Sequence, residues 1–183
     1  MALSLETINY LQEEQKKLDI FIHQQNELEM KDTFYLRKLA LLVEIGEAAN
    51  ELKSFKYWKK DKDVSLEKVQ EELIDCLHFF LSLVNCSQIN FNEYFSPKIE
   101  KKLDTNKILL TIFKETGRLV WLKEEKKREN EKFYYRYYRW LSIFEKLCRQ
   151  IDFDEEKLLE VYNHKNKINQ ERQLKNTNTF IHK

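Results

Sequence analysis

The chain has 183 residues, of which only two are glycine and one is proline, and its 32 basic residues nearly balance its 31 acidic residues. Glycine and proline make up about 12% of an average globular chain, so their scarcity excludes folds that need tight hairpins or glycine-rich phosphate loops. A net charge of +1 gives no global field to attract nucleic acid or an anionic membrane. We therefore expect a single all-α domain over residues 1–183, a helical bundle of about six helices.

Apolar residues at helical spacing predict three helices in the first half of the chain. The first runs from about Thr7 to Gln25, the second begins near Thr33 and continues toward Phe55, and the third runs from Leu66 to Asn85. The segment 59–63 is too charged to lie in a core, and Ser65 is placed as the N-cap of the third helix.

Three further helices are expected in the second half. Ser96 and Pro97 mark the start of the fourth helix, which continues to about Lys126. The charged run 123–132 is typical of a solvated turn, and the fifth helix follows over Phe133–Gln150.

The last helix is expected to begin at Asp152. Glu155 stands three residues later, which is the spacing of a capping box, and the helix continues through Asn169. A frayed tail is expected over about residues 174–183.

Cysteine usage and hydropathy indicate the cellular compartment. Cys76, Cys86 and Cys148 are odd in number and lie in apolar helical segments, which favours reduced, buried thiols over a disulfide framework. The first residues lack the basic and apolar regions of a secretion signal, and no window reaches 18 uninterrupted apolar residues. We expect a cytoplasmic protein that does not enter a membrane.

Two acidic pairs lie on consecutive apolar helices. Residues three or four apart share a helix face, so Glu44 aligns with Glu47 and Glu72 aligns with Asp75. Apolar residues surround both pairs, which leaves a narrow polar seam on helices that are otherwise buried. Because a short connection joins the two helices, we expect them to be antiparallel neighbours whose acidic pairs converge.

Such a cluster requires a cation, because converging carboxylates repel one another and raise their own pKa values. All-oxygen ligands suit Mg²⁺, or alternatively Mn²⁺, which keep waters and bridge to substrate phosphates. The alternative is that both pairs are ordinary solvated faces of a chain that is 34% charged. Their position among apolar residues, where burial is expected, makes the metal site about as well supported as this alternative.

The last helix carries a candidate anion site. Lys165, Asn169 and Arg172 are spaced four and three apart, so two cations and an amide share a face suited to phosphate oxygens. The alternative is a solvated basic end that complements the helix dipole.

The run FYYRYYRW at 133–140 allows a different class of function. Interleaved aromatic and basic residues superficially suit stacking on single-stranded nucleic acid. An amphipathic helix whose aromatic face fills the core or a subunit contact is favoured, because the net charge is near zero.

The segments EIGE at 44–47 and ELID at 72–75 match the ExxE…ExxD signature of the all-α nucleoside triphosphate pyrophosphatases, which include the MazG-like proteins and the dimeric dUTPases. With FKYW at 55–58, IDCLHFFLSL at 74–83 and YNHKNKINQERQ at 162–173, the chain resembles the dimeric dUTPases specifically. The resemblance extends from about Leu11 to Gln173.

The resemblance implies a Mg²⁺-dependent dUTP diphosphatase that releases pyrophosphate, takes dUDP as a second substrate and forms a homodimer. The metal ligands and catalytic carboxylates would be Glu44, Glu47, Glu72 and Asp75, with Glu47 orienting or deprotonating the attacking water. Lys165, Asn169 and Arg172 would bind the phosphates.

The resemblance also implies how the base would be bound. Gln15, or Lys16 if the alignment slides by one, and Asp19 would supply polar contacts to uracil, and Trp58 would stack or form a wall. Phe79, with Phe80 as the alternative, would exclude the 5-methyl group of thymine.

Several assignments stay open. His78 is either a ligand-side residue or a hydrogen-bonded core histidine. The alternatives to dUTP are dCTP or a broader set of nucleotides, or a non-catalytic module that binds nucleic acid or protein. The aromatic helices of the second half are the expected dimer surface. Some family members contact regulatory proteins, and nothing in this sequence indicates such a partner.

Overall fold

The structure is a computed structural model that describes residues 3–29, 33–91, 103–121 and 131–181. The regular elements of these residues are six α-helices, without strands, which confirms the all-α bundle. The helices are α1 (Leu5–Gln25), α2 (Phe34–Leu52), α3 (Leu66–Cys86), α4 (Thr105–Arg118), α5 (Glu131–Gln150) and α6 (Glu155–Ile181).

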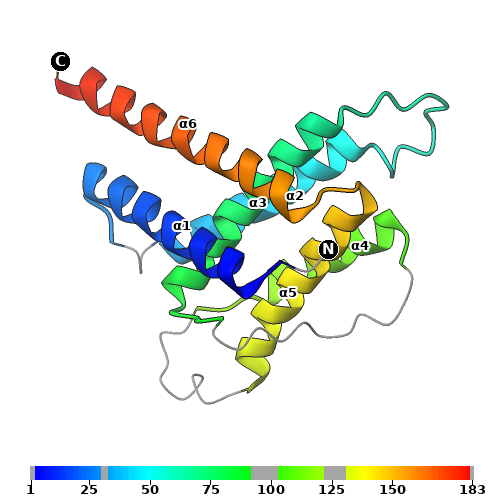
Figure 1. Ribbon diagram of the computed structural model, residues 1–183, viewed down its shortest axis with the longest axis horizontal. Coiled ribbons are helices and arrows are strands. Elements are labelled where there is room, and N and C mark those ends of the chain that lie inside the picture. Colours follow the sequence, from blue (N-terminus) through cyan, green and yellow to red (C-terminus); the bar gives the residue numbers. More distant parts are fainter. Residues whose placement is uncertain (1–2, 30–32, 92–102, 122–130, 182–183) are drawn as a thin grey trace.

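The antiparallel pair α2 and α3 forms the centre of the bundle, as the short connection between them predicts (Figure 1). α1 packs against α3, and α6 packs against both α1 and α3, so the first and last helices lie together on the same side of the pair. α4 and α5 form a second pair that is joined to the first through contacts between α2 and α4. Residues from both ends of the chain therefore reach α3.

The aromatic face of α5 fills the core, as its amphipathic pattern predicts. Phe133, Tyr137 and Trp140 are all buried. The Trp140 ring stacks on Phe80 with a centroid separation of 3.9 Å, and its Nε1 donates to Thr116 Oγ1 at 2.7 Å. Because these rings are used in packing, this part of the run 133–140 does not form a stacking surface for bases.

The fourth helix is shorter than the sequence predicts. Ser96, Pro97 and the run 122–130 lie outside the described residues, and α4 begins after Asp104, whose Oδ1 accepts from the Lys107 N–H at 3.0 Å. It ends at Arg118 rather than near Lys126, because Leu119 takes an extended conformation and buries its side chain. The expected continuation to Lys126 was wrong.

The last helix also differs from the prediction at both of its ends. Asp154, not Asp152, is the cap, since the Lys157 N–H donates to Asp154 Oδ1 at 2.8 Å and Asp152 has a left-handed φ of 52°. Glu155 directly follows this cap, so it does not stand at the third position that a capping box requires. Its Oε1 accepts instead from the Ser4 N–H at 2.9 Å and the Ser4 hydroxyl at 2.7 Å. The helix then continues to Ile181, across part of the expected frayed tail.

No helix in the described ranges combines the length and apolar character needed to cross a membrane. All three cysteines are free thiols, with Cys76 and Cys148 buried and Cys86 half-buried. The predicted burial is therefore confirmed for Cys76 and Cys148, whereas Cys86 is only partly buried.

Candidate functional site

Three of the four predicted carboxylates meet between α2 and α3. Glu44 projects from α2, and Glu72 and Asp75 project from α3, with one carboxylate oxygen of each lying within 4.8 Å of the others. All three side chains are half-buried. Glu47 lies on the next turn of α2 and is exposed, so it stands at the edge of this acidic cluster of Glu44, Glu72 and Asp75.

The electrostatics of the acidic cluster favour a cation. Burial, followed by the charges of Asp75, Glu47 and Glu72, raises the pKa of Glu44 to about 7. Burial and the neighbouring Asp75 and Glu47 raise the pKa of Glu72, and burial raises the pKa of Asp75. A donor set made only of carboxylate oxygens suits a hard divalent cation such as Mg²⁺, so the residues present fit that group.

α6 brings positive charge to the same place. Lys165 Nζ forms an ion pair with Asp75 Oδ2 at 2.6 Å, and this contact partly offsets the effect of burial on the pKa of Asp75. Asn169 and Arg172, one and two turns further along α6, line the adjoining cavity. The predicted basic face of the last helix therefore adjoins the predicted acidic seam.

A cavity of about 440 Å³ opens beside the acidic cluster. It is lined by residues from α1, α2, α3 and α6, among them Gln15, Asp19, Glu44, Asp75, Phe79, Asn169 and Arg172. Glu72 and Lys165 lie next to Asp75 at this cavity. Glu72 belongs to the acidic cluster with Asp75, and Lys165 forms the ion pair with it. Most of the predicted site residues thus surround one space.

A buried hydrogen-bond network forms one wall of the cavity. Asp19 accepts from the Ser82 hydroxyl at 2.8 Å, from Gln15 Nε2 at 2.9 Å and from Arg37 Nη1 at 3.3 Å. Arg37 Nη2 also lies 2.8 Å from His23 Nε2. Burial raises the pKa of Asp19, and Arg37 and Ser82 partly counter that effect.

Arg37, Ser82 and His23 line the cavity and were not predicted. A signal for Ser82 exists in the sequence, because Asp75, His78 and Ser82 are spaced three and four apart and share a face of α3. Arg37 lies beside Lys38 in α2, and nothing in its spacing indicates a partner on α1.

Three of the predicted or alternative base-binding residues lie elsewhere. Trp58 is 60% exposed and packs edge-on against Tyr57 and Phe55 in the connection between α2 and α3. Phe80 is buried in the core, whereas Phe79 lines the cavity. Of the two alternatives on α1, Gln15 lines the cavity and Lys16 does not.

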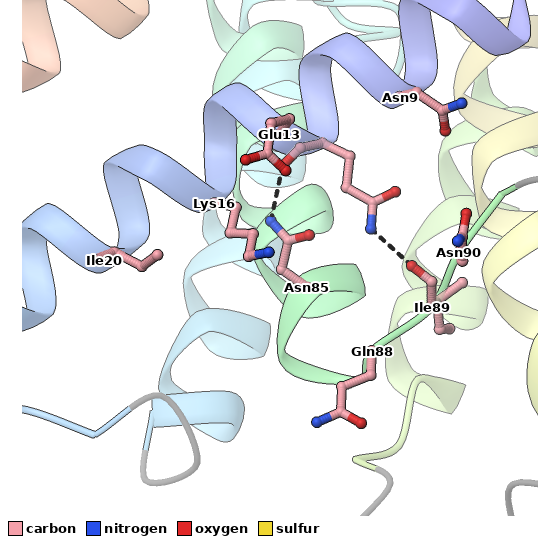
Figure 2. Close-up of a pocket in the computed structure, with 9 residues that line it drawn as sticks. Asn9, Glu13, Lys16, Ile20, Asn85, Gln88, Ile89 and Asn90 are labelled. Carbon is pink, nitrogen blue, oxygen red and sulfur yellow. Dashed lines mark hydrogen bonds between the residues drawn. The ribbon is translucent and has the colours of Figure 1, made fainter.

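Lys16 instead lines a second, polar hollow between α1 and the end of α3 (Figure 2). Two hydrogen bonds cross this hollow, from Asn85 Nδ2 to the Gln12 carbonyl oxygen at 3.1 Å and from Gln12 Nε2 to the Ile89 carbonyl oxygen at 2.7 Å. These contacts tie α1 to the end of α3 and to the segment that follows it.

Comparison with known proteins identifies a family for this chain. A family model described as dUTPase matches residues 7–176, which include every predicted site residue. No curated protein matches the chain.

Proposed function

The chain belongs to the dimeric all-α dUTPase family and is thereby a dUTP diphosphatase, and we propose that it hydrolyses dUTP to dUMP and pyrophosphate with Mg²⁺ or Mn²⁺. The proposed metal ligands are Glu44, Glu72 and Asp75 of the acidic cluster, with Glu47 at its edge. The observation that carries the proposal is that this cluster and the basic face of α6 adjoin the same cavity.

Each charged group has a proposed part in the reaction. Glu47 orients the attacking water and accepts its proton, which its exposed position one turn from Glu44 allows. Lys165 and Arg172 stabilise the charge that develops on the phosphate oxygens, and Asn169 donates to the same group. A divalent cation, when bound, supplies Lewis acidity and a clamp for the phosphates.

The base is proposed to occupy the cavity. Gln15 and Asp19 supply polar contacts to uracil, and Phe79 supplies the apolar wall that rejects the thymine methyl group. Trp58 lies outside the cavity, so we do not assign it a base contact. We also propose dUDP as a substrate, as the resemblance to the dimeric dUTPases implies.

A nucleotide panel tests this function, in the presence of Mg²⁺ and after its removal with a chelator. We expect dUTP to be turned over in preference to dCTP and dTTP, and we expect no turnover without a divalent cation. Glu72→Gln should lower kcat/KM for dUTP by about 100-fold or more, the scale of removing one electrostatic contact at a reacting centre.

Glu71→Gln is the matched control, since Glu71 is the exposed neighbour on the same helix and does not belong to the acidic cluster. It should change kcat/KM only slightly. Preferential turnover of dCTP would overturn the assignment of the base, and a lack of turnover of every nucleotide would overturn the proposed hydrolysis.

A further inference from the structure

His78 is a buried residue of the cavity wall to which the reaction assigns no part. Its side chain lies on α3 three residues after Asp75, it lines the cavity, and it is only 5% exposed. The ring stacks on Tyr162 of α6, with the ring centroids 4.3 Å apart and the planes inclined by 24°. The imidazole is therefore fixed in position.

The hydrogen-bond network also fixes which ring nitrogen carries the proton. Gln15 donates from Nε2 to Asp19 Oδ1, so its carbonyl oxygen Oε1 is directed to His78 Nδ1, 2.6 Å away. Because a carbonyl oxygen can only accept, Nδ1 must be the N–H of the neutral ring. The other nitrogen, Nε2, then carries a lone pair and can only accept.

Nε2 has no hydrogen-bond partner among the residues that the structure describes, although it is buried. Leaving such an acceptor unmatched costs about 1–3 kcal/mol. Protonation does not relieve this cost, because burial and the charge of Lys165 lower the pKa of His78 to about 3. Because His78 lines the cavity, a bound ligand with a donor group at Nε2 would relieve this cost.

We propose that His78 Nε2 accepts a hydrogen bond from the nucleoside of the bound substrate and is a specificity residue of the cavity. This inference rests on the proposed function, since it takes deoxyuridine nucleotides as the ligand. The nucleoside of dUTP has two donors, the N3–H of uracil and the 3′-OH of the sugar. Either group can donate a hydrogen bond to Nε2.

The two donors have different consequences for specificity. The N3 atom of cytosine carries a lone pair, so a contact at N3 would make His78 repel dCTP. A contact at the 3′-OH would leave the bases equivalent and would select nucleotides with an intact sugar. Thymine retains both donors, so its rejection is left to Phe79 in either case.

Substrate analogues and one variant test the inference together. His78→Phe removes the acceptor and retains a ring that can stack on Tyr162. We expect it to lower kcat/KM for dUTP by about 10- to 100-fold, because the substrate donor is left unmatched. The kcat/KM values of the wild type and His78→Phe are also compared for two analogues. N3-methyl-dUTP lacks the N3–H, and 2′,3′-dideoxyuridine triphosphate lacks the 3′-OH.

The analogue that lacks the contacted donor should be a poor substrate of the wild type and should lose little more in His78→Phe. That result supports the inference and identifies the donor. An equal loss for dUTP and both analogues, or no loss for dUTP, would overturn it. Absence of dUTP turnover by the wild type would instead show that the proposed function has failed.

A second measurement uses the wild type alone, so it does not depend on the folding of the variant. In ¹⁵N-histidine NMR spectra, the chain's four histidines give a small set of signals. We expect His78 to show a protonated Nδ1 and a bare Nε2, and we expect the Nε2 signal to shift when a non-hydrolysable dUTP analogue binds. A protonated Nε2, or an Nε2 signal that does not shift when the analogue binds, would contradict the inference.

Discussion

Arg37 and Asp19 form a buried ion pair in the cavity wall. Their side chains are 7% and 6% exposed, and Arg37 Nη1 lies 3.3 Å from Asp19 Oδ2. Removing one partner of such a pair leaves the other charge uncompensated, which typically costs about 3–5 kcal/mol. We expect Arg37→Met to lower the free energy of unfolding, measured by urea denaturation, by this amount.

Lys157→Met is the comparison, because Lys157 pairs with Glu160 in an exposed position and such pairs contribute about 0–1 kcal/mol. The double variant Arg37→Met with Asp19→Leu should recover part of the loss, since it removes both charges. Similar losses for Arg37→Met and Lys157→Met would show that the buried pair contributes no more than a surface pair.

The site residues that the sequence predicts are those that share a face of one helix, and the residues that it does not predict depend on contacts between helices. The acidic pairs and the basic face of α6 are each contained in one helix, so their three- and four-residue spacing is readable from the sequence. The partnership of Arg37 with Asp19 joins α2 to α1, and no local pattern encodes which helices meet. Trp58 lies outside the cavity because the connection between α2 and α3 sets its position, and no helical spacing describes that connection.

At the scale of the helix, the start of α6 depends on one side chain. Asp154 Oδ1 accepts from the Lys157 N–H at 2.8 Å, which satisfies a backbone donor that has no partner within the helix. Asp154→Ala should lower the free energy of unfolding by about 1 kcal/mol, measured by urea denaturation.

Asp152→Asn is the matched control, because asparagine tolerates the left-handed conformation of this position. It should leave stability nearly unchanged. If Asp152→Asn were the more damaging substitution, the cap would lie at Asp152, as the spacing to Glu155 suggests.

The helices differ in how far the sequence determines their bounds. α1, α3 and α5 have long apolar patterns, and their bounds agree with the prediction within two residues. At the C-terminal end of α4 and around the first residue of α6, tertiary contacts contribute as well. Leu119 turns into the core, and Glu155 binds Ser4 at the other end of the chain. A pattern within one segment does not contain such contacts.

At the scale of the whole molecule, an apolar stripe on α2 is the proposed homodimer surface. Tyr35, Leu36, Leu39 and Val43 are 50–68% exposed and share one face of α2, and the resemblance to the dimeric dUTPases implies a homodimer. The aromatic residues of α5, the expected interface, are instead largely used in the core. Leu39→Glu should therefore shift the protein from dimer to monomer, measured by light scattering after size-exclusion chromatography.

Leu110→Glu provides the control, since Leu110 is also exposed but lies on α4. It should leave the dimer intact. A wild type that is monomeric at all accessible concentrations, or a Leu39→Glu variant that stays dimeric, would contradict an interface at α2.

The cavity wall combines the first helix with the last, since Gln15 lies on α1 and Arg172 lies on α6. A ribosome must therefore synthesise almost all of the described chain before the cavity can exist. A nascent chain that ends before α6 carries the acidic cluster without Lys165 beside it. Such a chain lacks the part of the cavity wall that α6 supplies, so we expect enzymatic activity to begin only after the last helix has emerged from the exit tunnel and docked.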